Sequence, residues 1–163
     1  TGGMIAQRIT SVSGASEVFG YGFVTYWAEA KTRLVGVQPE VIERYNVVSA
    51  PVAAQMALGA AQASGSDIAV SVTGLAGPGG GDAVRPVGTV YLGAARGGKV
   101  YVQKLFVSRP DRALVRARAA QAALTLALRL AQGKVPAHTK PLAAAQQQDE
   151  AALAALNEAF LAE

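Results

Sequence analysis

Three observations predict a layered α/β fold with a mixed sheet. Apolar and aromatic runs typical of strands alternate along the chain with segments that carry helix start and stop signals. Two apolar runs flank Arg96-Gly97-Gly98-Lys99, which is typical of a β-hairpin and adds an antiparallel pair to the sheet. The chain has 163 residues, of which 51% are hydrophobic, so it can form one domain with a sizeable core.

Helices are indicated by capping residues, by proline in a first turn and by glycine just past a last turn. Ser49 followed by Pro51, for example, predicts a helix start. The expected helices cover Gly3–Ile9, Ala28–Val35, Pro39–Tyr45, residues 50–64 and Pro110–Gln132. Strands are indicated by short runs of apolar, β-branched or aromatic residues between turn residues. The expected strands cover Val18–Tyr26, Ile68–Val72, Thr89–Ala95 and Val100–Val107.

The C-terminal end is expected to be an addition to the main domain. Residues 1–138 form the predicted domain and residues 139–163 a helical extension, joined by a linker over Val135–Pro141. The predicted extension helix covers Leu142–Ala162, and its apolar face carries Leu153, Leu156 and Phe160.

Composition excludes several classes of function. Cysteine is absent, so these residues supply no disulfide, thiolate metal site or cysteine nucleophile, and the one histidine, His138, lies near the end. No apolar run has the length of a membrane span and no signal peptide is visible, so a cytoplasmic protein without membrane contact is expected. The chain starts at Thr1 rather than Met, which indicates processing or a start inside a longer protein.

Charge is unevenly distributed along the chain, whose net charge is +4. Residues 139–163 carry one basic and four acidic side chains, which leaves 14 basic and 7 acidic side chains on residues 1–138. A basic body favours an anionic ligand such as a phosphate. Nucleic acid is less favoured, because the basic residues form no dense run with aromatics between them. The acidic extension could pack on its own body, a second copy or a partner domain, and we expect a homo-oligomer.

Two groups of residues near the start could carry chemistry. Thr1-Gly2-Gly3 opens a helix, where free N–H groups can bind an anion or an oxyanion, although a helix start with flexible glycines gives the same pattern. Tyr26 precedes the helix that carries Lys31. A lysine of lowered pKa can act as a general base beside a tyrosine. From spacing alone, a strand-end tyrosine and a solvated lysine are the simpler interpretation.

A glycine-rich loop, Thr73–Gly81, follows a predicted buried strand, which is where ligands bind in open α/β sheets. It matches neither a dinucleotide-binding nor a Walker A loop. Five glycines exceed what a connector needs. We therefore expect ligand contacts from Thr73, Gly74, Gly77, Gly79 and Gly80.

Arginines recur on one face of the long predicted helix, at Arg109, Arg112 and Arg116. Such a row can hold a phosphate through paired N–H groups. Arg112, in the first turn, is the candidate for this contact, whereas Arg116 and Arg118 fit a solvated helix face somewhat better.

Several segments together resemble one family, the C-terminal domain of CinA, the competence/damage-inducible proteins, whose stand-alone form is nicotinamide-nucleotide amidohydrolase. The resemblance covers roughly residues 1–133. The matching segments, in the family's order, are Thr1-Gly-Gly, Gly22–Lys31, Leu34–Val37, Val48-Ser49, Val72–Gly80 and Arg85–Tyr91.

The resemblance implies a three-layer α/β/α domain that hydrolyses the amide of nicotinamide mononucleotide to nicotinic acid mononucleotide and ammonia, without metal or organic cofactor. It implies a serine nucleophile assisted by a lysine and a tyrosine, to which Lys31 and Tyr26 correspond. Backbone N–H groups near Thr1 and Gly2 would hold the oxyanion. The Gly74–Gly81 loop and Arg112 would hold ribose or phosphate.

The family's serine lies in a Glu-Ser-Cys-Thr-Gly-Gly motif, so by this resemblance it falls just before Thr1, together with a preceding strand and helix. Whether a CinA-type N-terminal domain also precedes stays open. Two alternatives to the amidohydrolase remain. Thr1 could itself be an N-terminal nucleophile. The domain could also be a non-catalytic nucleotide-binding or regulatory module, because Trp27 and Ala28 stand where the family commonly has Ser and Asn.

Overall fold

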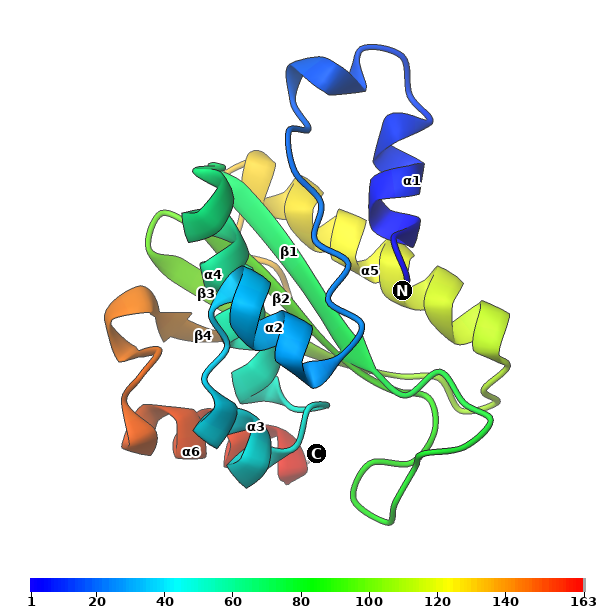
Figure 1. Cartoon of the computed structure of the whole chain (residues 1–163), viewed down its shortest axis with the longest axis vertical. Coiled ribbons are helices and arrows are strands. Elements are labelled where there is room, and N and C mark those ends of the chain that lie inside the picture. The colour runs from blue at the N-terminus through cyan, green and yellow to red at the C-terminus, as the bar shows by residue number, and fades with distance from the viewer. Residues whose placement is uncertain (163) are drawn as a thin grey trace.

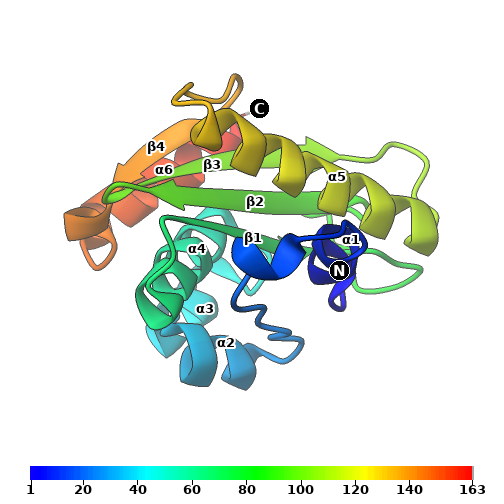
Figure 2. The ribbon, with the colours of Figure 1, turned by 90° about the horizontal axis from the view of Figure 1, so that it is seen from above.

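A four-stranded sheet lies between two helical layers in the computed structural model, which describes residues 1–162 (Figures 1 and 2). The strands stand in the order β1-β2-β3-β4. Their bounds are β1 Ile68–Gly74, β2 Thr89–Arg96, β3 Lys99–Phe106 and β4 Lys140–Ala143. The α/β class and the hairpin are confirmed, with Gly97 and Gly98 forming the turn between β2 and β3. Within residues 1–162 all three strand pairings are antiparallel, so the expected mixed pairing is not found there.

The five predicted helices are confirmed, with end points that differ by at most two residues. They are α1 Met4–Thr10, α2 Ala28–Val35, α3 Pro39–Tyr45, α4 Ala50–Ser64 and α5 Arg112–Ala131, followed by α6 Glu150–Leu161 and interspersed with two short 3-10 helices, η1 Ala15–Glu17 and η2 Ala144–Gln146. Local caps account for two of the longest helices. The Ser49 hydroxyl accepts from Val52 N at the start of α4, and the Asp111 carboxylate accepts from Leu114 N at the start of α5. Figure 2 shows α5 on one face of the sheet and α2, α3 and α4 on the other.

Side chains of the central strand β2 alternate between two cores. Val90 and Leu92 pack towards α5, while Tyr91 and Ala95 pack towards α4 and α6. This alternation is the ordinary period-two pattern of a strand covered on both faces. The run Thr89–Ala95 is therefore buried throughout.

Helix α2, which carries Lys31, is held against α4 at a glycine. A Cβ added at Gly59 would lie 1.7 Å from the carbonyl oxygen of Val35, at the end of α2. Only glycine permits two helix backbones to approach this closely. The position of α2 thus depends on the small volume of residue 59.

The predicted strand over Val18–Tyr26 is wrong. The chain between η1 and α2 is extended but pairs with no strand, and Val18, Tyr21 and Val24 are exposed. High β-propensity expresses a fit to a paired, half-buried surface and forms no strand without a partner edge. The outer edge of β1 faces this segment and pairs with no strand among residues 1–162.

The predicted single helix over Leu142–Ala162 is wrong in its first part. Residues 140–143 form β4 on the edge of β3, and α6 begins only at Glu150, where the Asp149 carboxylate caps the backbone N–H groups of residues 151 and 152. The expected apolar face of the helix is confirmed, because Leu153, Leu156 and Phe160 are buried against the α4 side of the sheet. Strand β4 includes the last two residues of the expected linker.

None of the helices in the part of the chain that the structure describes combines the length and apolar character needed to cross a bilayer.

Candidate active site

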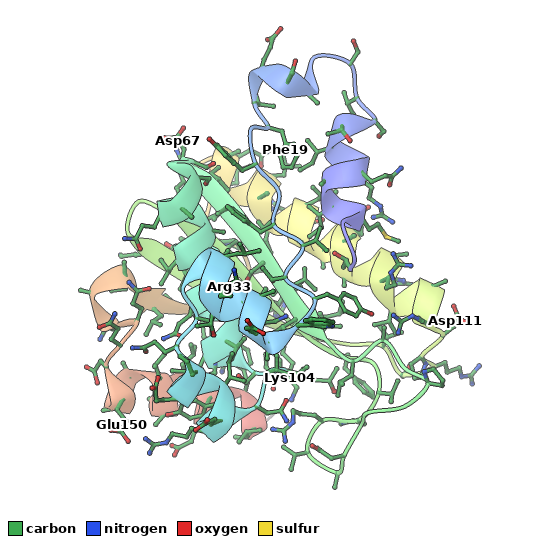
Figure 3. All side chains as sticks on the ribbon, in the orientation of Figure 1. Phe19, Arg33, Asp67, Lys104, Asp111 and Glu150 are labelled. Carbon is green, nitrogen blue, oxygen red and sulfur yellow. The ribbon has the colours of Figure 1, made fainter. Side chains whose placement is uncertain are left out.

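A cavity of about 800 Å³ lies beside the outer edge of β1, between α1, α5 and the segment that leads into α2. Figure 3 shows Phe19 pointing from this segment towards α1. The cavity wall includes many of the residues expected to form a site: Thr1, Gly2, Gly3, Tyr26, Lys31, Thr73 and Gly74. Three segments far apart in the sequence are therefore brought together around one space.

Lys31 is a buried amine on the first turns of α2. Its side chain is 6% exposed, and Nζ donates to the carbonyl oxygen of Thr25 at 2.5 Å. Burial lowers the pKa of this lysine below its ordinary value, because water no longer stabilises the ammonium form. A neutral amine keeps two N–H bonds and a lone pair, so it can donate to Thr25 and still accept a proton.

Tyr26 lies at the mouth of the cavity and is linked to α5. Its hydroxyl oxygen accepts from Arg112 Nη2 at 2.7 Å, and Arg112 Nη1 donates to the carbonyl oxygen of Gly77 at 3.0 Å. Arginine has no acceptor atom, so the Tyr26 hydroxyl must be the acceptor in this bond. Its own O–H is consequently left to donate elsewhere, and the side chain is 64% exposed.

Arg116 contacts the start of the chain, which the sequence pattern did not indicate. Its Nε and Nη2 both donate to the carbonyl oxygen of Thr1, at 3.3 and 3.0 Å, and the side chain is part-buried. A Cβ placed on Gly2 would lie 3.6 Å from Arg116 Nη2, so the guanidinium rests on this glycine. The interpretation of Arg116 as a solvated residue is therefore wrong.

Thr1 lies in a basic environment formed by the side chains of Arg116, Lys31 and Arg112. Within residues 1–162, no group of three or more His, Cys, Asp and Glu side chains is arranged to hold a metal ion.

The glycine-rich loop contributes less to the cavity than its composition suggests. The Thr73 hydroxyl donates to Val47 O at 2.7 Å and holds the loop before α4. Gly77 contributes its carbonyl to Arg112, while Gly79 and Gly80 are exposed and stand outside the cavity wall.

Asp82, directly after the glycine-rich loop, holds the following residues through its carboxylate. The carboxylate accepts from the backbone N–H groups of Val84 and Arg85 and pairs with the Arg85 guanidinium at 2.9 Å. Donation from the backbone of Arg85 holds the pKa of Asp82 below its ordinary value. The loop is thus folded on itself.

Two hydrogen-bonding groups of the site, the carbonyl of Thr25 and the guanidinium of Arg116, are not apparent from sequence motifs. The carbonyl of Thr25 belongs to the backbone, so no residue type marks it. Arg116 does share a helix face with Arg112, four residues earlier, and that spacing is the one signal that connects it with the site.

Comparison with known proteins gives a consistent assignment. The family described as the CinA C-terminal domain matches residues 1–131. A CinA-like protein of Akkermansia muciniphila is 51% identical over 125 residues, which are 76% of this chain and 30% of that protein. A protein of Enterobacter agglomerans named nicotinamide-nucleotide amidohydrolase PncC is 49% identical over 130 residues, which are 79% of each chain.

The crystal structure of the competence/damage inducible protein CihA from Agrobacterium tumefaciens has the same fold. It superposes with a TM-score of 0.78 and 41% sequence identity over 80% of either chain. The present chain thus covers about 80% of the amidohydrolase PncC and of the crystallised protein, but about 30% of the CinA-like protein. With a family match over residues 1–131 and relatives near 50% identity, the chain belongs to the CinA C-terminal domain family.

Proposed function

We propose that this domain hydrolyses the carboxamide of nicotinamide mononucleotide, giving nicotinic acid mononucleotide and ammonia. The observation that carries the proposal is the buried, hydrogen-bonded Lys31, which lines the same cavity as Thr1 and Tyr26. A lysine with a lowered pKa is suited to accept a proton from a hydroxyl nucleophile. The similarity to the enterobacterial amidohydrolase supports the choice of substrate.

The attacking group in this proposal is a serine just before Thr1. Its hydroxyl proton passes to Lys31 Nζ as its oxygen bonds to the carboxamide carbon. Backbone N–H groups near Thr1 and Gly2 stabilise the oxyanion that forms. The C–N bond then breaks, and the proton held by Lys31 leaves with ammonia, directly or through the hydroxyl of Tyr26. Water then attacks the acyl-serine as Lys31 accepts its proton, the bond between the acyl carbon and the serine oxygen breaks, and that proton returns to the serine oxygen.

Substrate binding is assigned to the loop and to Arg112. A phosphate is a stronger acceptor for a guanidinium than a tyrosine hydroxyl or a peptide carbonyl. In this proposal the phosphate or ribose takes over N–H donors of Arg112 that now hold Tyr26 and Gly77.

The outer edge of β1, which pairs with no strand among residues 1–162, supports the expectation of a further strand before Thr1. Such a strand would fill part of the cavity and pair with the outer edge of β1. It would deliver the serine to the start of α1, beside Lys31.

The test measures ammonia released from nicotinamide mononucleotide by protein expressed from the complete open reading frame. We expect activity in the wild type and none in Lys31→Ala or in Lys31→Met, which keeps the length of the side chain. Arg33→Ala is the matched control, because Arg33 lies on the same helix and is exposed. Full activity without the lysine amine would refute the mechanism. Binding of the nucleotide without turnover would favour a non-catalytic module.

A further inference from the structure

The side chain of Arg116 links Thr1 to the long helix α5. Two of its N–H groups meet a single carbonyl, that of Thr1, 115 positions earlier in the sequence. The residue lies on α5, which is packed on the sheet through buried residues on both sides of it, Val115 and Ala119. The arginine can therefore fix the position of Thr1 relative to the core.

The segment that Arg116 holds meets α5 again further along, where Ile5 packs into the α5-side core and Arg8 Nη1 donates to Gln121 Oε1 at 3.5 Å. Helix α1 contains no buried residue, and Gly2 and Gly3 both have positive φ, +62° and +89°. Glycine backbone in this region is the most costly to order, because it has the most freedom to lose. Arg116 adds a contact at Thr1, directly before these two glycines.

The segment also borders the reactive groups. Thr1, Gly2 and Gly3 share the cavity wall with Lys31. We propose that Arg116 is a positioning residue, which holds the backbone of Thr1–Gly3 beside Lys31 without touching the substrate. This inference rests on the proposed function, since it assigns Arg116 a part in the same reaction.

Positioning has a specific kinetic signature. Displacing reacting groups by about 1 Å can lower the rate by about 100-fold. Arg116→Ala should therefore lower kcat about 10- to 100-fold and leave KM within about twofold. Arg116→Lys retains the charge and a donor nitrogen but loses the paired donation from two nitrogens, so its kcat should lie between those of the wild type and Arg116→Ala. Arg118→Ala is the matched control, because Arg118 is exposed on the same helix two residues later.

A second measurement tests the anchoring without any turnover. Backbone ¹⁵N order parameters of Gly2, Gly3 and Met4 should be near 0.85 in the wild type and fall below about 0.6 in Arg116→Ala. The order parameters of α5 should not change, which shows that the variant is folded.

The outcomes are distinguishable. A fall in order at Gly2–Met4 together with a selective loss of kcat supports the proposal. Unchanged order in Arg116→Ala overturns it whatever the activity, and reduced order with wild-type kcat overturns the positioning role. An inactive wild type would refute the proposed function and with it that role, while the order parameters would still decide whether Arg116 anchors Thr1–Gly3.

Discussion

The contact between α2 and α4 at Gly59 gives a quantitative prediction for both stability and activity. In Gly59→Ala the new Cβ would lie 1.7 Å from the carbonyl oxygen of Val35, whereas real Cβ atoms essentially never come within 3.0 Å of another atom. The two helices must therefore separate locally by about 1.3 Å. The obstructing atom belongs to the backbone, so no side-chain rotation relieves the contact.

Two opposing contributions determine how Gly59→Ala changes the free energy of unfolding. Overpacking of this kind costs about 3 kcal/mol at the upper end of the usual range. Replacing glycine by alanine inside a helix returns about 1 kcal/mol through helix propensity. The net loss of unfolding free energy is about 2 kcal/mol, which corresponds to a fall in Tm of about 4–8 °C for a chain of this size. The same displacement moves α2, and with it Lys31, so kcat should fall by up to about 100-fold.

Urea denaturation followed by circular dichroism measures the stability, and ammonia release measures the activity. Ala63→Gly is the matched control, because Ala63 is exposed in the last turn of the same helix. It reports helix propensity without a change of packing, and should cost about 1 kcal/mol. If Gly59→Ala is as stable as the wild type or more stable, propensity alone decides the effect and the close contact between α2 and α4 is refuted.

Three further predictions concern other parts of the molecule. Burial lowers the pKa of Lys31 in the folded state, so between that pKa and the ordinary value of 10.5 the unfolded chain binds more protons and wild-type stability rises with pH. The stability of Lys31→Met relative to wild type should accordingly decrease from pH 7 to pH 10 in urea denaturation, and a difference that stays constant would contradict the burial effect. Phe160→Ala should cost about 3–5 kcal/mol, because Phe160 is 2% exposed and packs edge-on against Tyr91. Leu161→Ala, at a side chain 47% exposed, should cost much less in the same assay, and equal losses would show that α6 does not dock as described. Light scattering after size exclusion should give a homo-oligomer, and a monomer mass at high concentration would exclude it.

Local sequence signals were sufficient to predict the five helices before residue 132 and the β-hairpin. The helix cap at Ser49 and the helix end at Gly36 act on neighbouring backbone groups, so both can be predicted from the local sequence. The turn at Gly97-Gly98 likewise defines the pairing of β2 with β3. These features need no information from distant parts of the chain.

Strand pairing between distant segments accounts for the two wrong secondary-structure predictions, at Val18–Tyr26 and in the first part of Leu142–Ala162. Val18–Tyr26 has strand-like residues but no partner strand within residues 1–162, whereas Lys140–Ala143 has weak strand signals and pairs with the outer edge of β3. A strand is stable only through the edge it joins, and edges are assembled from segments far apart in sequence.

Part of the candidate site could likewise be predicted from the sequence, and part appears only in the folded structure. The sequence by itself determined that Tyr26 and Lys31 stand five residues apart at the start of a helix, and the resemblance gave them roles. Only the tertiary structure decided that Lys31 is buried with a lowered pKa and that Arg116 is bound to Thr1. Burial and hydrogen-bond partners are set by elements that meet only when the chain folds, which is why spacing alone favoured a solvated lysine and a solvated arginine.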